Sequence, residues 1–437
     1  MALSPMMQQY LEIKKQYQDC ILFFRLGDFY EMFFDDAVLG AKELELTLTG
    51  KNCGQEERAP MCGVPFHSAD TYIARLVEKG YRVAICEQVE DPAQAKGIVK
   101  REVIKIVTPG TVTNQSMLSE KENNYLAAIF ASQEKTALAY GDISTGELSA
   151  TVFLTENASE TLLNELVKIN AREVLVSESL STYLELSEME KSLDAYFNIL
   201  SESYFSFSAS EALMKRQLSK EDAEISGISR NFHDEPELTC AIGALLSYLI
   251  ETQKQNLTHI SHFHIYEIGS HMSLDKATIR NLELTETLHE KKVQGSLLGV
   301  LDKTHTAMGG RKIKQWLREP LNQVAEINAR LDAVALLVKD VILRNNLKEA
   351  LKRIYDIERL SGRIACGSAN GKDMIALRNS IFVLPDIKLE LSGCESTLLS
   401  EMAEAFVDLT ELYDFIDHAI IEDPPFTIKE GGLIKQG

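Results

Sequence analysis

The chain contains 437 residues, carries a formal net charge of −20, and is 45% hydrophobic. This length predicts about three domains at roughly 150 residues each, and the apolar fraction allows a sizeable buried core. The acidity excludes a generic nucleic-acid binder with one broad basic face, because neutralising phosphates requires positive charge. Charge is mostly positive over residues 291–318 and mostly negative over residues 390–423. Any contact with nucleic acid must therefore be local.

The cysteine pattern and the apolar runs bear on the compartment. Seven cysteines are scattered along the chain, and none belongs to a Cys-x-x-Cys pair. This pattern is typical of reduced thiols in a cytosol. No apolar run is long enough to span a membrane. The N-terminus shows no basic segment followed by an apolar core, so no signal peptide is expected. These features predict a cytoplasmic location.

Residues 1–112 mix helix and strand patterns, which predicts a mixed α/β domain. Ser4-Pro5 is a helix start, with the serine as cap and the proline in the first turn. A second helix is expected after Asp35-Asp36, which suit the first turn. A third is expected over residues 68–79, with Ser68 as cap and Gly80 just past the end. Strands are predicted over residues 20–25, 82–88 and 103–107.

Residues 122–232 begin with three consecutive strand candidates, followed by a helix and a further strand. A meander that passes into alternating helix and strand predicts a second compact α/β domain. The three strands are expected at residues 125–130, 137–143 and 148–153, the helix at 160–169 and the next strand at 173–177. Residues 206–231 are polar and rich in serine and glutamate, so we expect a mobile surface segment there.

Residues 238–437 are predicted to be nearly all helical, because apolar residues recur about every 3.6 positions from residue 274 to 420. The apolar run 241–250 is expected to form a buried helix, and residues 263–268 have a strand-like pattern. Pro424-Pro425 is expected to end the last helix. The chain closes with residues 431–437, an extended segment without a closing element, which suggests a truncated chain.

Familiar catalytic patterns are absent. The sequence has no P-loop of the form Gly-x-x-x-x-Gly-Lys-Ser/Thr, so no nucleotide cofactor is expected here. Gly309-Gly310-Arg311-Lys312 looks similar but lacks the spacing, and we expect it to begin a helix. His262 and His264 would share a strand face, so a metal site is conceivable. A polar strand edge with solvated histidines is the favoured interpretation, because no acidic or cysteine ligand is placed nearby.

Asp142 and Glu147 are the next candidates for chemistry. Asp142 lies at a strand end, where a nuclease of the ribonuclease-H-like fold would place a metal-binding carboxylate. Two-metal chemistry requires several clustered acids, and only Glu147 is near in sequence. A turn-capping aspartate is therefore the favoured interpretation. Metal-dependent nuclease activity remains the alternative.

Phe29-Tyr30-Glu31 is the third candidate. On a strand, Phe29 and Glu31 would face the same side, about 6.6 Å apart, while Tyr30, Met32 and Phe34 would face the core. An aromatic wedge can enter a base stack from the minor groove. A carboxylate beside phosphates is unfavourable unless it finds a partner on a displaced base. Taken alone, the tripeptide fits a core phenylalanine and a solvated glutamate better.

Several longer motifs favour a base-contacting role for Phe29 and Glu31 instead, because these motifs occur together in a fixed order. The run Phe-Phe-Arg-Leu-Gly-Asp-Phe-Tyr-Glu-Met-Phe at residues 23–33 resembles the mismatch-probing segment of the MutS family of DNA mismatch repair proteins. The resemblance continues through residues 60–67, 83–88, 91–92, 107–111, 278–283, 309–321 and 356–360. It spans the chain, and several unrelated motifs in one order make it specific.

The resemblance implies three domains: a mixed α/β mismatch-binding domain (1–112), a ribonuclease-H-like α/β connector (122–232) and an all-α core and lever domain (238–437). It implies that Phe29 stacks on the mispaired base, that Glu31 hydrogen-bonds it, and that Lys51 lies near the DNA backbone. Double-stranded DNA with mismatches or small loops is the expected ligand, and the bacterial cytosol, in association with the nucleoid, is the expected location.

The resemblance also concerns the whole family member. The connector is expected to contact a MutL-like protein. A clamp and an ATPase domain would follow residue 437, with ATP and Mg²⁺ as cofactors and a homodimer as the active form. The alternative is a related paralogue that binds branched DNA, and members of that group generally lack the Phe-x-Glu probe.

Overall fold

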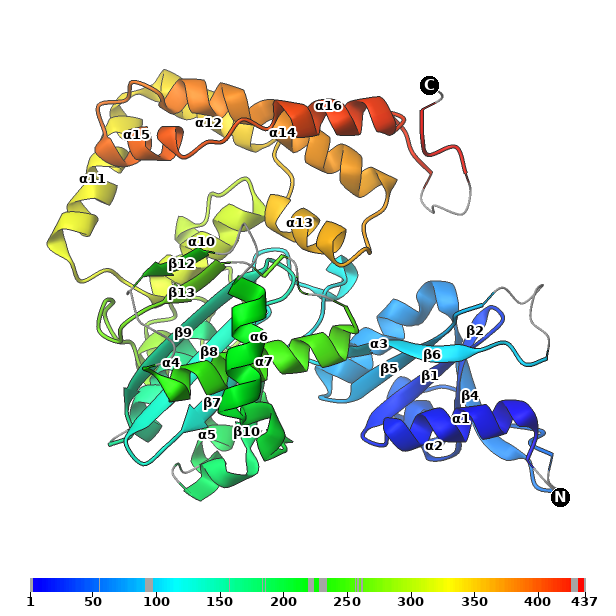
Figure 1. Ribbon diagram of the computed structural model, residues 1–437. Helices are drawn as coiled ribbons and strands as arrows, with labels where there is room; N and C mark the ends of the chain where they lie inside the picture. Colours follow the sequence, from blue (N-terminus) through cyan, green and yellow to red (C-terminus); the bar gives the residue numbers. More distant parts are fainter. Residues whose placement is uncertain are drawn as a thin grey trace.

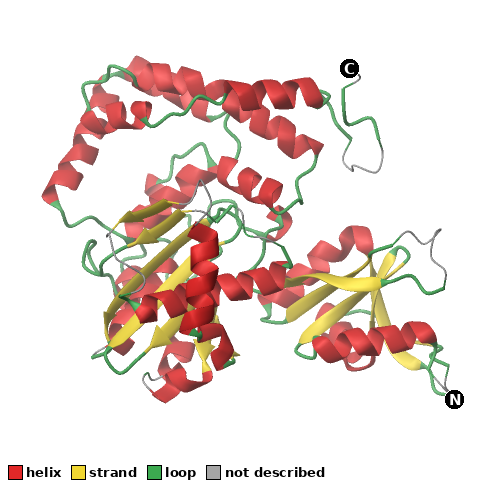
Figure 2. Cartoon of the chain, in the orientation of Figure 1, coloured by secondary structure: helices red, strands yellow, loops and turns green. Residues whose placement is uncertain are grey.

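The described residues form two sheets followed by a helical region, as the computed structural model shows (Figure 1). The structure describes residues 3–435 except for 55, 91–96, 157, 183, 185, 219–223, 228–233, 256, 258, 261 and 426–430. Figure 2 shows the strands gathered into separate sheets and the later part of the chain almost entirely as helices. The predicted class, mixed α/β domains followed by an all-α region, is confirmed.

The first sheet has the strand order β3-β4-β2-β1-β5-β6. β1 pairs antiparallel with β2 and parallel with β5, so the sheet is mixed. Its predicted helices and strands occur close to their predicted bounds. The strands are β1 (Cys20–Leu26), β2 (Phe29–Phe33), β3 (Thr49–Lys51), β4 (Ala59–Pro65), β5 (Arg82–Gln88) and β6 (Arg101–Val107), and the helices are α1 (Pro5–Gln16), α2 (Phe34–Leu44) and α3 (Ala69–Glu78).

Each face of the first sheet has its own core, because successive side chains of a strand point to opposite faces. Ile21 and Phe23 of β1 pack with buried residues of α2 and α3. Leu22 and Phe24 pack with buried residues of α1. Helices therefore cover both faces of the sheet.

Both predicted N-cap positions in this region are confirmed, but the expected capping hydrogen bonds and the expected orientation of Phe34 are not found. Ser4 and Ser68 occupy the N-cap positions of α1 and α3, but neither side chain makes a capping hydrogen bond. Phe34 does not face the core beside Tyr30 and Met32. The strand ends one residue earlier, and Phe34 begins α2 with a φ of +53°. It packs on the opposite core, beside α1.

The second sheet has the order β11-β10-β7-β8-β9-β13-β12. β7, β8 and β9 form the predicted antiparallel meander, and the outer strands pair in parallel. The strands are β7 (Leu126–Ala131), β8 (Lys135–Asp142), β9 (Glu147–Leu154), β10 (Glu173–Ser177), β11 (Tyr196–Leu200), β12 (Glu224–Gly227) and β13 (His262–Ile265). The helices are α4 (Ala158–Ile169), α5 (Leu186–Ser192), α6 (Phe207–Leu218) and α7 (Pro236–Gln253).

Helix α7 and strand β13 belong to the second sheet by packing. Buried α7 residues from Leu238 to Leu249 share one core with β7, β8 and β9, and β13 pairs with β9. The expected ranges 122–232 and 238–437 instead group both elements with the helical region. The 3.6-residue pattern of α7 identifies a helix but carries no information on which neighbour it covers.

The segment 206–231 was expected to be mobile, and the structure corrects this for its first half. Residues Phe207–Leu218 form α6, which packs against α7. Ser210 and Gln217 are buried there, and Gln217 donates to the carbonyls of Leu257 and Ile260. These bonds satisfy a polar side chain that a sequence pattern assigns to solvent. Residues 219–223 and 228–231 lie outside the described residues.

The helical region begins after β13 and shares two further cores. It contains the predicted helix start near Gly309, where Thr306 caps α10 by accepting from the Gly309 N–H at 3.0 Å. The last helix ends at Ala419, before Pro424-Pro425. The helices are α8 (Lys276–Asn281), α9 (Leu297–Leu301), α10 (Ala307–Arg318), α11 (Val324–Lys339), α12 (Val341–Leu351), α13 (Ile357–Ala365), α14 (Gly371–Leu391), α15 (Thr397–Glu404) and α16 (Thr410–Ala419).

Candidate nucleic-acid interface

A tight hairpin places Phe29 at the start of β2. Leu26 of β1 pairs with Phe29, so only Gly27 and Asp28 form the loop. Gly27 has a φ of +58°, a conformation that favours glycine in two-residue hairpin loops. Phe29 follows the turn directly, and 46% of its surface is exposed. The sequence therefore holds a large aromatic ring at the tip of a rigid hairpin instead of burying it.

Glu31 and Lys51 lie on neighbouring parts of the same sheet. β4 lies between β2 and β3, with Glu31 opposite Gly63 and Lys51 opposite Ala59. The Lys51 Nζ is 2.5 Å from Glu31 Oε2, and both side chains are partly exposed. Gly63 has no side chain between them, so the two long side chains can meet across β4. The structure thus brings together Phe29, Glu31 and Lys51, which we call the probe edge.

The residues beneath the probe edge are held by a buried core. Tyr30 and Met32 point away from the exposed side and pack among the α2 and α3 residues, as predicted. The Tyr30 hydroxyl donates to Glu87, which also pairs with Arg25 at 3.3 Å. Burial and the Glu87 contact raise the pKa of Tyr30 well above its usual range. The phenol therefore stays protonated and keeps β2 bonded to β5.

Phe66 and Arg25 extend the exposed surface beside Phe29, and sequence reasoning did not single them out. The Phe66 N–H donates to the Asp28 carbonyl at 2.9 Å, which fixes Phe66 next to the hairpin loop. Its ring is 44% exposed, and the Arg25 guanidinium lies 3.9 Å from the ring centroid. Both residues fall within the family-like motifs. An aromatic residue directly after a strand was the available signal, but its exposure depends on tertiary packing.

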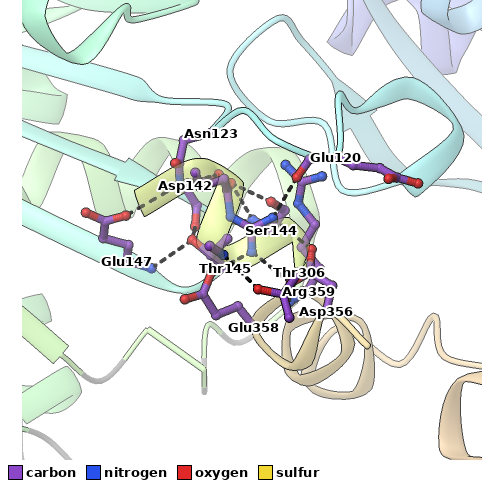
Figure 3. A network of polar contacts seen from close by, with 12 residues as sticks. Glu120, Asn123, Asp142, Ser144, Thr145, Glu147, Thr306, Asp356, Glu358 and Arg359 are labelled. Atoms are coloured by element: carbon purple, nitrogen blue, oxygen red, sulfur yellow. Dashed lines mark hydrogen bonds and ion pairs between the residues drawn. The ribbon is translucent and has the colours of Figure 1, made fainter. Parts of the chain in front are cut away.

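Asp142 caps a turn, as the favoured interpretation predicted (Figure 3). Its Oδ1 accepts from the Ser144 N–H at 2.9 Å and from the Ser144 hydroxyl at 2.7 Å. Its Oδ2 accepts from the Asn124 N–H at 2.9 Å and the Asn123 amide at 3.2 Å. The carboxylate is fully buried, and protein donors occupy both oxygens. These bonds give Asp142 a structural role at the turn.

Glu147 lies across the same turn and behaves differently. It accepts from the Tyr125 hydroxyl at 2.9 Å. Burial raises its pKa to about 7, with a further increase from the nearby Asp142 carboxylate. Glu147 lines a cavity of about 1100 Å³ between β9, β13 and α10, together with His262 and His264.

The two histidines of β13 lie on one exposed face of the strand, as expected. His264 Nδ1 is 3.1 Å from the Ser226 hydroxyl, and its ring stacks on Tyr266. Among the described residues, no group of three or more His, Cys, Asp or Glu is arranged to hold a metal ion. All seven cysteines are free. No described helix has the length and hydrophobicity needed to cross a membrane.

Comparison with protein families gives consecutive matches along the chain. Residues 4–116 match MutS domain I, residues 124–261 match MutS domain II, and residues 277–436 match MutS domain III. The first match contains the whole probe edge. The second contains α7, in agreement with its packing on the second sheet.

Similar curated proteins cover the whole chain. DNA mismatch repair protein MutS of Ruminiclostridium cellulolyticum is 50% identical over 435 residues, which is 99% of this chain and 49% of the relative. The MutS proteins of Acetivibrio thermocellus and Desulforamulus reducens are 48% and 49% identical over all of this chain, and it covers 49% and 50% of them. The chain thus spans about half the length of these relatives. With its sheets and helices matching MutS domains I, II and III in order, the chain belongs to the MutS family.

Proposed function

We propose that this chain recognises mispaired bases in double-stranded DNA, with Phe29 stacking on the mispaired base. The observation that carries the proposal is the position of Phe29, exposed at a hairpin tip on the same face as Glu31. Inserting such a ring between base steps requires unstacking, which is easier at a mismatch than at a matched pair. The names of the relatives, DNA mismatch repair protein MutS, support the same conclusion.

Glu31 would add selectivity by hydrogen-bonding the displaced base. A paired base has no free partner for a carboxylate, so Glu31 opposes binding to matched DNA. Its partner Lys51 offsets part of the negative charge near the phosphates. Binding to a mismatch would therefore replace the Lys51 contact of one Glu31 oxygen or use the other oxygen. In the first case, Lys51 would be free to approach the DNA backbone.

Phe29→Ala tests the proposal in the protein encoded by the complete gene. Fluorescence anisotropy would compare affinities for a duplex with one G·T mismatch and for the matched duplex. The mismatch preference is expected to fall to near one, because the stacking ring is lost. Phe382→Ala is the matched control, since Phe382 is 56% exposed on α14, outside the first sheet. An unchanged preference in Phe29→Ala would contradict the proposal.

The wider activity of the family extends the proposal. We infer that the second domain contacts a MutL-like protein and that the active form is a homodimer. ATP and Mg²⁺ are the cofactors proposed for the intact protein, and the sequence of this chain contains no P-loop. Co-purification of a MutL-like protein with the intact protein, lost on removing residues 124–261, would support the first of these inferences.

A further inference from the structure

Residues 108–124 connect the two sheets, and we call them the joining segment. The segment begins after β6 ends at Val107 and runs to just before β7 begins at Leu126. Its only helical turn among the described residues is residues Gln115–Met117. A connection of this length without regular structure is expected to be a flexible tether. Here, however, both of its ends are bonded to buried charged side chains.

Glu173 of β10 holds the first end of the joining segment. Glu173 Oε2 accepts from the Thr108 hydroxyl at 2.5 Å and from the Gly110 N–H at 2.8 Å. Glu173 Oε1 accepts from the Tyr248 hydroxyl at 2.6 Å and from the Asn198 amide at 3.3 Å. The residue is only 2% exposed. Four donors therefore satisfy one buried carboxylate, two from the segment and two from the second domain.

The turn at Thr108 is shaped to meet this carboxylate. Since the Thr108 hydroxyl donates to Glu173, the 2.8 Å contact with Thr111 requires the Thr111 hydroxyl to be the donor. Thr111 in turn accepts from the Thr108 N–H at 3.0 Å. A Cβ on Gly110 would lie 2.9 Å from the Glu173 Cβ and 2.8 Å from a Leu126 methyl. Only glycine allows the backbone to approach Glu173 this closely.

Two arginines of the helical region hold the second end. Arg359 of α13 is 2% exposed, and it donates to the carbonyls of Ser119 at 2.8 Å and Glu122 at 2.5 Å. Arg311 of α10 donates to the Glu120 carbonyl at 2.9 Å. Figure 3 shows Arg359 and Glu120 close to the turn that contains Asp142 and Ser144. The end of the segment is therefore fixed where the second domain meets the helical region.

Asn124 ties the two ends of the segment to each other. Its amide donates to the Pro109 carbonyl at 2.9 Å, and its backbone N–H donates to Asp142. The two anchored ends thus share one residue. Because a buried charge is costly unless it is hydrogen-bonded, displacing the segment would remove two of the four donors to Glu173 and the carbonyl acceptors of Arg359. One arrangement of the segment is consequently favoured over the many that a free tether would adopt.

We propose that Glu173 and Arg359 are positioning residues that hold the first domain, and with it Phe29, in one orientation relative to the rest of the chain. Glu173 anchors the segment to the second domain, and Arg359 anchors it to the helical region. The role in DNA binding rests on the proposed function, whereas the fixed orientation does not.

The orientation can be measured by pulsed electron paramagnetic resonance in the protein encoded by the complete gene. Spin labels would be placed at Lys15→Cys on α1 and Asp386→Cys on α14, both exposed, with Cys366 and Cys394 replaced by alanine. The labelled protein would be mixed with an excess of unlabelled protein, so that the measured distance lies within one subunit of the proposed homodimer. A single narrow distance peak is expected in the parent. Arg359→Gln and Glu173→Gln are each expected to broaden it and to remove the single peak.

Matched controls separate positioning from general loss of buried charge. Arg363→Gln removes another α13 arginine, whose 2.6 Å pair with Asp373 stays within the helical region. Glu165→Gln removes a buried carboxylate of the second domain that contacts Tyr266 and Lys168 instead of the segment. Both controls should keep the narrow peak. Equal widths in Arg359→Gln and Arg363→Gln would overturn the proposal. If a Gln variant does not fold, Arg359→Lys and Thr108→Val test the same contacts more mildly.

A DNA-binding arm distinguishes this inference from the proposed function. Arg359→Gln should weaken binding to the mismatched duplex by about tenfold, since only a fraction of molecules presents Phe29 correctly. Phe29→Ala should lose the mismatch preference but keep the narrow distance peak. A broadened peak in Arg359→Gln with unchanged affinity for the mismatched duplex would contradict the positioning role. A narrow peak in Arg359→Gln would show that Arg359 does not anchor the segment, whatever the outcome for Phe29→Ala.

Discussion

The probe edge and the joining segment both use charged side chains, but in opposite surroundings. At the probe edge, Glu31 and Lys51 pair at the surface, next to an exposed Phe29. At the joining segment, Glu173 and Arg359 are buried and bonded to backbone and hydroxyl groups. Water can replace a lost partner at the surface but not in the interior. Charge at the edge is therefore available for a ligand, whereas charge at the segment is committed to the fold.

Changes near the joining segment should consequently alter stability most, and changes at the probe edge should alter ligand binding most.

Arg311→Ala is expected to give the largest loss of stability. It leaves Asp356 and Glu358 without their 2.7 and 2.6 Å partner, and breaking a buried ion pair costs about 3–5 kcal/mol. Urea unfolding, followed by fluorescence of Trp316 on the same helix, measures the loss. Lys352→Ala, which removes an exposed pair with Glu349, should cost no more than about 1 kcal/mol. Equal losses of stability in Arg311→Ala and Lys352→Ala would contradict the difference between buried and exposed charges.

Glu147→Gln should raise the free energy of unfolding by an amount that depends on pH. Because the folded state raises the pKa of Glu147 to about 7 from 4.5, the folded state binds more protons than the unfolded state between these values. The contribution of Glu147 to the free energy of unfolding is complete below pH 4.5 and is lost as the pH rises to 7. The variant should thus exceed the parent by roughly 1–3 kcal/mol at pH 8 and match it near pH 4. Glu134→Gln, an exposed carboxylate of the same domain, is the control. A constant difference across this range would contradict the assignment.

Gly27→Ala should lower the free energy of unfolding by about 1 kcal/mol, because the loop requires a positive φ that alanine adopts poorly. No atom lies within 4 Å of the added Cβ, so the cost should come from the backbone alone. Gly27→Asn should recover part of it, since asparagine tolerates this conformation. Thermal unfolding of the three proteins provides the measurement. A larger loss in the Asn variant than in the Ala variant would point to a steric cause.

Among these four variants, Glu31→Gln should change the free energy of unfolding least. Its main effect should be on binding to matched DNA. Removing the carboxylate should strengthen binding to a matched duplex by about two- to fivefold, since phosphates no longer repel it. Stability should change by less than about 1 kcal/mol, as for other surface pairs. Glu12→Gln, an exposed charge on α1, corrects for the general effect of net charge. Weaker binding to matched DNA would contradict the role given to Glu31.

Much of the fold could be predicted from local patterns. The strand-length apolar runs and the 3.6-residue spacing of the helical region both have short-range physical causes. The shared face of Phe29 and Glu31 followed from strand periodicity alone. Phe34 was missed because a strand pattern does not show where a positive φ ends the strand. The first half of segment 206–231 was missed because polar composition hides a helix whose glutamine is satisfied inside the protein.

The amino-acid sequence by itself determined the family and the order of its domains, and it placed Phe29 and Glu31 on one face of a strand. Motifs and strand periodicity depend only on residues that are close together in the chain. Tertiary structure alone decided that α7 covers the second sheet, that Lys51 reaches Glu31 across β4, and that Glu173 and Arg359 meet the joining segment. These contacts join residues far apart in the chain. Their free energy depends on burial and on the position of each donor and acceptor, which exist only once the chain has folded.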